Sequence, residues 1–339
     1  MQAIVFDRVG PPQDVLEIRD VPIPEIKDDE VLVRMVSAPI SPGDFLFIED
    51  LYPEPKKPHF PGQIAGNHGA GIVAKVGRDV TIEPGALVAF SYYNSWAEYA
   101  AIPAEWLMPL PPGLPPEKAG QFFNFVTAWD LLAAARVGSG DWLAVTAGNS
   151  TVSTMVLQFA RAKNVNVISL VRRARSDLKG LDLKGLDLKG LGAADVIELS
   201  SLSRGVGERV MQISDGKGLN ALVDNVGGPV TGELIRSMAF GGQVIINGGM
   251  SKERFELHNF DVLMRGIEIK SHVYRYFFTP PQPGEMQELE KISAVAAPAQ
   301  FKVPLGGLNR LEDYKRAVEQ TLAHPEHGKQ FFAPDGHDH

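Results

Sequence analysis

From about residue 117 onward, short apolar segments alternate with segments of helical periodicity. Residues 142–147 are expected to form a strand, 151–163 a helix and 165–171 a second strand, a unit of about 30 residues. Further apolar segments follow at 195–198, 221–226, 243–247 and 267–272. Strands that alternate with helices form parallel sheets, because each helix returns the chain to the same edge. The pattern predicts a doubly wound α/β domain.

The first third of the chain has a different character. Runs rich in β-branched residues at 31–36, 72–76 and 86–90 are bounded by glycine, proline or aspartate. Prolines interrupt any long helix here, since proline lacks a backbone donor and clashes with the preceding turn. A dense proline cluster at 109–116 marks the end of this region. We therefore expect a compact β-rich domain before residue 117.

Composition excludes several kinds of site. The chain has no cysteine, so disulfides, iron–sulfur clusters and thiolate-bound zinc are impossible. Lys and Arg number 33 against 41 Asp and Glu, a net charge of −8, and no basic stretch is dense enough to bind a nucleic-acid backbone. The first residues given lack the basic segment and long apolar run expected of a leader peptide, and no stretch of about 18 apolar residues appears further on. We expect a cytoplasmic protein with neither nucleic acid nor membrane as a partner.

The turn after the strand at 142–147 is the first candidate site. It contains Gly148 and is followed by Asn149, Ser150, Thr151 and Val152 at the start of the next helix. Backbone N–H groups at a helix start, with the positive end of the helix dipole, stabilise a pyrophosphate. The turn lacks the three-glycine dinucleotide fingerprint, so a structural strand-to-helix turn fits its residues nearly as well. Its place between strand and helix favours cofactor binding.

Arginines follow the second strand of this unit, at Arg172, Arg173 and Arg175. An NAD-binding chain usually places a carboxylate here to accept the ribose hydroxyls, and an acid would repel a 2′-phosphate. Guanidinium groups instead form charge-assisted pairs with a phosphate. We therefore predict NADPH as the cofactor. Which arginine binds stays open, and a solvated basic cluster is the alternative.

A pentapeptide repeat separates this strand from the next. The sequence DLKGL occurs at 177–181, 182–186 and 187–191. A period of five matches neither helix nor strand, and its glycines weaken a helix. We interpret the repeat as a duplication that lengthens a surface loop.

Short motifs along the whole chain resemble those of the medium-chain dehydrogenase/reductase superfamily, in particular its zinc-free 2-enoyl thioester reductases and quinone oxidoreductases. Several motifs in the right order are more specific than any one of them. They are APISPGD at 38–44, GNHG at 66–69, NFVTAW at 124–129, NS at 149–150, NVGG at 225–228, GGMSK at 248–252 and GKQ at 328–330.

The resemblance implies a two-domain architecture. A GroES-like, β-rich substrate domain would comprise residues 1–116 and 273–339, and a Rossmann cofactor domain would comprise 117–272. In the family, the last strand of the cofactor sheet, here 267–272, pairs with its twofold mate. The resemblance therefore also implies a homodimer.

The resemblance also bears on metals. Zinc alcohol dehydrogenases of this superfamily carry a cysteine near the position of Ser41 and a histidine at that of Asn67, and both ligands are missing here. We expect no metal. Enoyl reductases usually have Glu where this chain has His68, and one histidine without partners makes no metal site. We expect His68 to be a hydrogen-bonded structural residue.

Tyr52 is the candidate catalytic residue. It lies at about the place where enoyl thioester reductases carry their active-site tyrosine. Reduction of a conjugated double bond builds negative charge on the carbonyl oxygen and then needs a proton at the α-carbon, and a phenol can serve both steps. A packing or lid role in the proline-rich loop is the equal alternative.

By resemblance, further residues frame the cofactor and the acceptor. Two departures from the enoyl reductases are Ser41 in place of Asn and Phe125 in place of Pro. Tyr274 and Tyr276 fall in a stretch that lines the family's acyl pocket, although an aromatic core or dimer cluster fits them equally well. The remaining implied cofactor residues are Ser41, Thr127, Asn225, Gly248, Gly249, Met250 and Lys329.

Together these features predict an NADPH-dependent reductase of activated carbon–carbon double bonds, with 2-enoyl thioesters or other α,β-unsaturated carbonyl compounds as acceptors. An NADPH:quinone oxidoreductase is the alternative within enzymes. A nicotinamide-binding sensor or structural binder without turnover is the alternative of another class.

Overall fold

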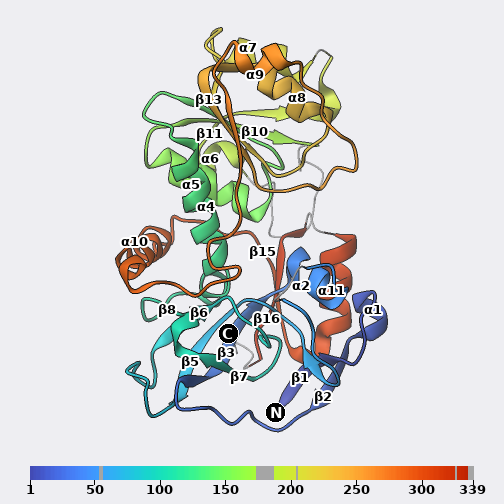
Figure 1. The fold of residues 1–339 in the computed structure, drawn as a ribbon, viewed down its shortest axis with the longest axis vertical. Helices are drawn as coiled ribbons and strands as arrows, with labels where there is room; N and C mark the ends of the chain where they lie inside the picture. The colour runs from blue at the N-terminus through green and yellow to red at the C-terminus, as the bar shows by residue number, and fades with distance from the viewer. Residues whose placement is uncertain (53–55, 173–186, 204, 325–326, 335–339) are drawn as a thin grey trace. The chain divides into compact units, whose positions relative to one another are not determined.

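The computed structural model describes residues 1–52, 56–172, 187–203, 205–324 and 327–334 (Figure 1). The chain divides into two compact units. Unit 1 comprises Met1–Phe125 and Arg275–His339, and unit 2 comprises Val126–Tyr274. Unit 1 is thus built from both ends of the chain, whereas unit 2 is continuous in sequence. The predicted domain boundaries, after 116 and after 272, stay predictions, because compactness alone does not show which residues fold as one domain.

A seven-stranded sheet is the centre of unit 1. Its strands follow the order β15–β16–β3–β5–β6–β8, and β7 also pairs with β3. β3 is the hub because it pairs antiparallel with β5, β7 and β16, which buries its alternating apolar side chains. The strands are β3 (Glu30–Pro39), β5 (Gly69–Val76), β6 (Leu87–Phe90), β7 (Tyr99–Pro103), β8 (Leu107–Pro109), β15 (Leu305–Asn309) and β16 (Lys329–Phe332).

The N-terminus of the chain forms a smaller sheet in the same unit. Its order is β2–β1–β4, with β1 (Gln2–Phe6) between β2 (Glu17–Asp20) and β4 (Gln63–Ile64). Short helices complete the unit. They are α1 (Pro12–Val15), α2 (Pro42–Ile48), α3 (Pro116–Ala119), α10 (Met286–Ala296) and α11 (Tyr314–Ala323), with 3₁₀ turns η1 (Ala104–Trp106), η3 (Pro283–Glu285) and η4 (Leu311–Asp313).

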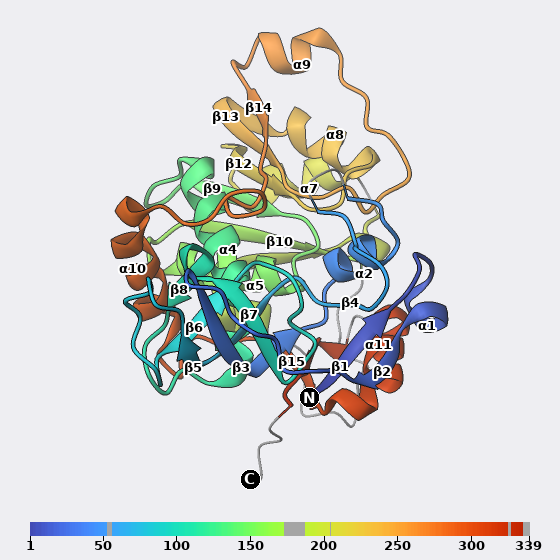
Figure 2. The same cartoon turned by 60° about the horizontal axis from the view of Figure 1, so that its bottom comes forward.

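Unit 2 contains a six-stranded parallel sheet in the order β11–β10–β9–β12–β13–β14 (Figure 2). The chain starts in the middle, runs to one edge, returns and runs to the other edge, which is the doubly wound order of dinucleotide-binding domains. The predicted fold class is confirmed. The strands are β9 (Trp142–Val145), β10 (Asn166–Val171), β11 (Ala193–Glu198), β12 (Leu219–Asp224), β13 (Met238–Ile246) and β14 (Glu268–Ser271).

Helices connect these strands. The α5 helix is amphipathic and buries Met155, Val156 and Phe159, among others, which explains why its boundaries could be predicted closely from apolar spacing. The helices are α4 (Phe122–Ala135), which begins in unit 1, then α5 (Thr151–Arg161), α6 (Leu188–Leu191), α7 (Val206–Ile213), α8 (Pro229–Arg236) and α9 (Asn259–Leu263), with the 3₁₀ turn η2 (Leu199–Ser201).

The third copy of the pentapeptide repeat is not a loop. It forms α6, because the Asp187 carboxylate accepts a hydrogen bond from the Gly190 N–H and caps the first turn. Gly192 then ends the helix at a φ of 124°. The first two copies lie outside the described residues.

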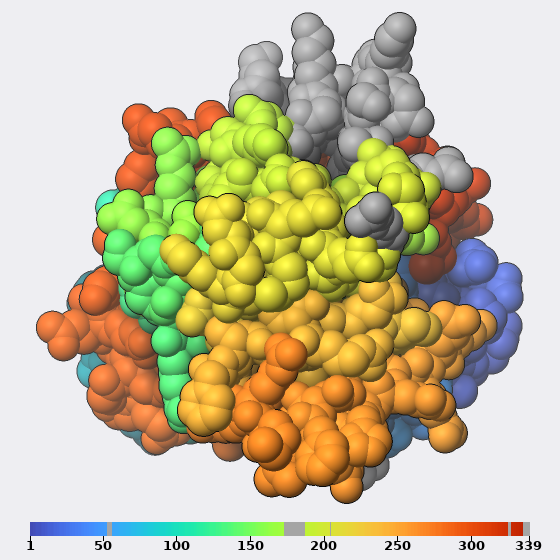
Figure 3. Space-filling view, turned by 90° about the horizontal axis from the view of Figure 1, so that it is seen from above, coloured from blue at the N-terminus to red at the C-terminus, as the bar shows by residue number. Residues whose placement is uncertain are grey.

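Among the described residues, both edge strands of the unit 2 sheet, β11 and β14, pair on one side only. β14 pairs with β13 alone, and apolar side chains of the α9 and β14 region are exposed. The orange segment that contains this region lies at the surface in Figure 3.

Among the described residues, no helix combines the length and apolar character that crossing a membrane requires.

Candidate functional site

In unit 1, the start of α2 presents a buried carboxylate. Ser41 is the N-cap residue, Pro42 takes the first helical position, and Asp44 closes a capping box by accepting the Ser41 N–H at 2.8 Å. The other oxygen of Asp44 accepts hydrogen bonds from the Asn67 N–H at 2.9 Å and its Nδ2 at 3.2 Å. The sequence Ser-Pro-Gly-Asp thus fixes both the helix start and the carboxylate.

The environment of Asp44 favours its neutral form. Its side chain is almost fully buried, and this burial raises the pKa of the carboxyl to about 6, although the three N–H donors and Lys329 oppose the shift. Near pH 7 the carboxylate is still mainly ionised. It is therefore a buried negative charge that attracts the cations around it.

Lys329, a predicted cofactor residue, lies beside Ser41. It begins β16, whose pairing with β3 brings the end of the chain to the start of α2. Its ammonium donates to Ser41 Oγ at 3.1 Å and to the Ile40 carbonyl at 3.3 Å. Burial lowers the pKa of Lys329 to about 8, and Asp44 partly offsets this effect.

Tyr52, the predicted catalytic residue, is half-buried next to Asp44. A Cβ at Gly43 would overlap the Tyr52 hydroxyl, so the absence of a side chain at Gly43 makes room for the phenol. The Tyr52 ring meets the Phe277 ring edge to face, with centroids 5.0 Å apart. Burial raises the pKa of the phenol, and the Asp44 carboxylate raises it further. The hydroxyl therefore remains protonated and can donate a hydrogen bond.

Lys56 lies in the same region and was missed by the sequence analysis. It is 4% exposed, and its ammonium lies 4.9 Å from the centroid of Phe277 and 5.6 Å from that of Tyr93. Burial lowers the pKa of Lys56 to about 8, with Asp44 acting in the opposite direction. No local signal marks it, because a lysine in a proline-rich loop is usually solvated.

His68 packs as a structural residue would. Its ring stacks on Phe123 with centroids 3.9 Å apart, and its Nδ1 lies 3.1 Å from Ser91 Oγ, so the predicted hydrogen bond is present. Burial, together with Lys56 and Lys329, holds the pKa of His68 well below its usual range. The imidazole is neutral at pH 7. We call Asp44, Tyr52, Lys56, His68 and Lys329 the polar cluster.

In unit 2, the turn between β9 and α5 packs closely against β10. A Cβ at Gly148 would overlap Ser169 Oγ on β10 and lie tightly against the Leu170 backbone, so a larger residue would force its neighbours to shift. Ser150 caps α5 by accepting the Ser153 N–H at 3.3 Å. The next N–H groups, of Thr151 and Val152, belong to the first turn, where a helix supplies no partner of its own. Asn149, Ser150, Thr151 and Val152 are all half-buried, and the turn fits a pyrophosphate.

Hydrogen bonds connect the ends of β12 and β13 to this turn. Asn225 Nδ2 donates to the Thr146 carbonyl at 2.9 Å and to Ser153 Oγ at 3.2 Å. Its Oδ1 accepts from Asn247 Nδ2 at 2.7 Å. A Cβ at Gly248 would overlap the Asn225 carbonyl. Asn225 and Gly248 therefore belong to one network with the turn, whereas Gly249 and Met250 are exposed beyond it.

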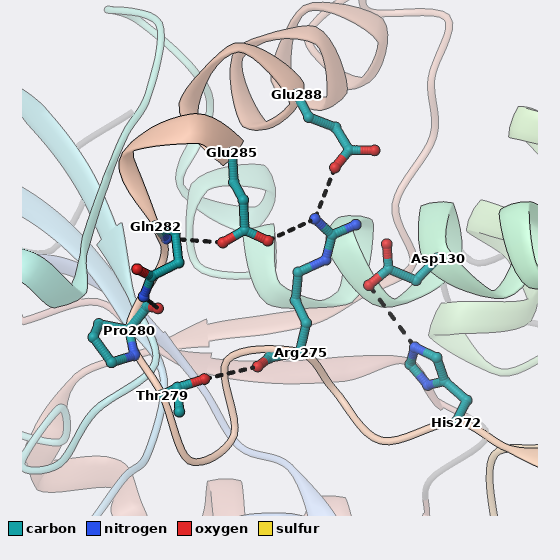
Figure 4. A network of polar contacts seen from close by, with 8 residues as sticks. All are labelled: Asp130, His272, Arg275, Thr279, Pro280, Gln282, Glu285 and Glu288. Carbon is teal, nitrogen blue, oxygen red and sulfur yellow. Dashed lines mark hydrogen bonds and ion pairs between the residues drawn. The ribbon is translucent and has the colours of Figure 1, made fainter.

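The network extends to the end of β14. Asn247 Oδ1 lies 2.9 Å from His272 Nδ1. His272 Nε2 in turn lies 3.9 Å from Asp130 Oδ2 on α4, the pair drawn in Figure 4. Thr127, one turn earlier on α4, is buried. The polar side chains thus follow the carboxyl ends of the parallel strands, where open α/β sheets bind ligands.

Of the predicted phosphate-binding arginines, Arg172 is exposed directly after β10, and its carbonyl accepts the Ser200 N–H at 3.1 Å. Arg173 and Arg175 lie outside the described residues. Within the described part of the chain, no group of three or more His, Cys, Asp or Glu side chains could hold a metal ion.

The predicted pocket residues differ in burial. Tyr274 is half-buried, whereas Tyr276 is 2% exposed and lies under the Arg275 guanidinium, 5.7 Å from the ring centroid. Arg275 also pairs with Glu288 at 2.7 Å and with Glu285 at 3.3 Å, as Figure 4 shows. These ion pairs fix the segment that carries Phe277. The Phe277 ring contacts both Tyr52 and Lys56.

Comparisons with known proteins agree with the fold. Residues 27–112 match the alcohol dehydrogenase GroES-like domain, and residues 151–293 match the zinc-binding dehydrogenase family. The mitochondrial enoyl-acyl-carrier-protein reductase of Xenopus tropicalis is 31% identical over 94% of this chain and 91% of its own length. The human enzyme of the same name is 28% identical over 95% of this chain and 86% of its own length.

Among solved structures, a Bacillus thuringiensis protein assigned as an NADPH:quinone reductase superposes with a TM-score of 0.84. It is 27% identical and covers 98% of both chains. The chain belongs to the medium-chain dehydrogenase/reductase superfamily, with mitochondrial enoyl-acyl-carrier-protein reductases among its relatives.

Proposed function

We propose that this chain is an NADPH-dependent reductase of carbon–carbon double bonds conjugated to a carbonyl group, with 2-enoyl thioesters as acceptors. The observation that carries the proposal is the Tyr52 phenol, which is half-buried beside Gly43, Asp44 and Phe277 and carries its proton near neutral pH. The names of the frog and human relatives support this class of acceptor.

Tyr52 would act on charge that appears only during the reaction. When hydride adds to the β-carbon, the electrons of the double bond move toward the carbonyl oxygen, which becomes negative. A phenol O–H directed at that oxygen stabilises the charge, and its proton can then pass to the α-carbon. Because the ground-state carbonyl is nearly neutral, this interaction favours the transition state over the bound acceptor.

NADPH supplies the hydride when it is bound. The turn residues Asn149, Ser150, Thr151 and Val152 would hold its pyrophosphate at the start of α5, and Arg172 would pair with its 2′-phosphate. The close packing at Gly148 and Gly248, which leaves no room for a side chain, supports this use of the turn. The other cofactor residues stay predictions, and they are Ser41, Thr127, Arg173, Arg175, Asn225, Gly249, Met250 and Lys329. The pocket residues Tyr274 and Tyr276 also stay predictions.

An acceptor panel tests the proposal. We expect purified protein to oxidise NADPH in the presence of crotonyl-CoA, longer 2-enoyl thioesters or simple enones, followed by absorbance. If none of these acceptors is consumed, the proposal is wrong.

A quinone reductase is the second candidate, favoured by the similarity to the Bacillus thuringiensis structure. Turnover of quinones with little turnover of enoyl thioesters would support it. Tight NADPH binding without turnover of either class would instead support a nicotinamide-binding sensor or structural binder.

We also propose a homodimer formed through the edge of the unit 2 sheet. A second copy could add antiparallel to β14 and pair its free backbone groups, while covering exposed Leu263 and Met264 of the α9 segment. The cytoplasmic location stays a prediction, since the relatives named above are mitochondrial.

A further inference from the structure

Lys56 has an unusual environment for a lysine. Its side chain is nearly buried, and the structure gives its ammonium no hydrogen bond to a carbonyl or carboxylate among the described residues. Its neighbours are the faces of Phe277 and Tyr93. Aromatic faces attract a cation, but they do not satisfy the three N–H donors of an ammonium. The donors that the rings leave open can therefore bind water or an electron-rich ligand.

The polar cluster carries a surplus of positive charge. Near pH 7, Lys56 and Lys329 are mainly protonated, Asp44 is mainly ionised and His68 is neutral. The Asp44 oxygens are already occupied by N–H groups of Ser41 and Asn67. The Lys329 ammonium has two oxygen acceptors of its own. Lys56 is therefore the cation of the cluster with donors to offer to a ligand.

Lys56 and Tyr52 lie against the same ring. The Phe277 centroid is 4.9 Å from the Lys56 ammonium and 5.0 Å from the Tyr52 ring centroid. Phe277 is held in a segment fixed by the ion pairs of Arg275 with Glu285 and Glu288. The Tyr52 ring and the Lys56 ammonium therefore contact the same aromatic side chain.

We propose that Lys56 is a second hydrogen-bond donor to the carbonyl oxygen of the acceptor, alongside Tyr52. The inference rests on the proposed function and extends it to the substrate class. Two donors, one of them cationic, favour acceptors whose reduction concentrates negative charge on a single carbonyl oxygen.

The step balances as follows. Hydride forms a C–H bond at the β-carbon, the nicotinamide is oxidised by two electrons, and the electrons of the double bond shift to give an enolate oxygen. Lys56 and Tyr52 donate hydrogen bonds to this oxygen, and Lys56 keeps its proton throughout the step. The Tyr52 proton then forms the C–H bond at the α-carbon, and the resulting phenolate regains a proton from water.

The decisive variants are Lys56→Met and Lys56→Arg, with Lys57→Met as the matched control. Methionine keeps the length of the side chain without its charge, and arginine keeps the charge. Lys57 is the next residue, but it pairs with Asp50 at 2.9 Å. We expect Lys56→Met to lower kcat/KM for crotonyl-CoA by about 100-fold, which is the usual effect of removing one such donor. The kcat/KM of Lys56→Arg should be at least tenfold higher than that of Lys56→Met. The kcat/KM of Lys57→Met should stay within twofold of wild type.

Two measurements are independent of turnover. The first is binding of 4-nitrophenol, whose ionised oxygen imitates an enolate and whose absorbance reports its ionisation. Wild-type protein should bind the ionised form preferentially, and Lys56→Met should lose that preference. The second is thermal unfolding. Because the variant removes a buried cation, its melting temperature should equal or exceed that of wild type. A purely structural Lys56 would give a lower melting temperature.

The pH dependence of activity tests whether Lys56 is the group that must be protonated. Charged or titratable groups in the cluster around Lys56 are Asp44 on α2, Tyr52 after it, His68 before β5, Tyr93 after β6 and Lys329 on β16. Activity should fall above about pH 8 as Lys56 loses its proton. In Lys56→Arg this decline should move to higher pH. An unmoved decline would assign it to Lys329 and contradict the inference.

The failures of the two proposals are distinguishable. If wild-type protein reduces no enoyl thioester or enone, the proposed function fails. If wild type is active and Lys56→Met retains its kcat/KM and its preference for nitrophenolate, the function stands and the role of Lys56 is wrong.

Discussion

At the scale of single residues, the Tyr52 hydroxyl is the sharpest test of the chemistry. Tyr52→Phe keeps the ring that packs on Phe277 and removes only the O–H. We expect enoyl thioester turnover to fall by about 100-fold or more, because the hydroxyl acts on charge present only in the transition state. NADPH affinity, measured by fluorescence titration, should remain within a few fold of wild type.

The same variant separates the two candidate acceptors. A quinone is protonated on oxygens that solvent can reach, so its reduction should be less sensitive to Tyr52→Phe. Unchanged enoyl turnover would show that Tyr52 is a packing residue, which is the alternative left open by its place in a proline-rich loop.

Cofactor preference is a second prediction at this scale. Replacing Arg172 and Arg173 together with alanine should weaken NADPH binding by about 2–4 kcal/mol, because charge-assisted bonds to the 2′-phosphate are lost. NADH has no such phosphate and should bind as before. Calorimetry with both cofactors measures the difference, and equal losses would mean that the arginines have a structural role.

The polar cluster shows what sequence can and cannot predict about residues. Ser41, Tyr52 and Lys329 were singled out because motifs of the family contain or surround them. Lys56 has no motif, and its burial depends on Phe277, which lies more than 200 residues away in the chain. Tertiary contacts of this kind have no local signal, so only the folded chain reveals them.

At the scale of elements, the turn between β9 and α5 gives a test with an internal control. Gly148→Ala places a methyl group against Ser169 Oγ and the backbone of Leu170. We expect a loss of about 1–3 kcal/mol in the free energy of unfolding, typical of overpacking, and at least tenfold weaker NADPH binding.

Gly138→Ala, at the other end of β9, is the control. A Cβ at Gly138 meets no atom closer than 3.8 Å, so this variant should match wild type in chemical denaturation and in NADPH titration. If both variants behave alike, the close packing at Gly148 is not what shapes the turn.

Most elements of unit 2 were predictable because the period of the apolar residues and the length of each segment indicate the same type of element. Apolar runs of strand length alternate with amphipathic helices, so the positions of β9, α5 and β10 follow from local pattern alone. β13 begins at Met238, five residues before the predicted strand, because Gly241 and Gly242 resemble a turn while the backbone continues through them. The helix α6 was missed since its stability depends on one side-chain cap at Asp187.

At the scale of the whole molecule, assembly is the testable property. We expect light scattering at micromolar concentration to report a dimer. Ile269→Lys places a charge on the exposed edge strand β14, and Leu263→Lys places one on the adjoining helix α9, where burial against a second copy would be costly.

The double variant should therefore be monomeric, while its circular dichroism spectrum remains that of wild type. A wild-type monomer would contradict the proposal, as would a double variant that remains dimeric.

The split sequence of unit 1 also has a consequence for how the protein is made. A ribosome releases the chain from its N-terminus, so all of unit 2 emerges before β16 exists to pair with β3. Unit 2 can begin to fold during translation, whereas the central sheet of unit 1 must wait for the final residues of Arg275–His339. Lys329 arrives with that last strand. A nascent chain that stops early can therefore carry a folded cofactor-type unit but lack a cation of the polar cluster, and synthesis through β16 becomes the condition for a complete site.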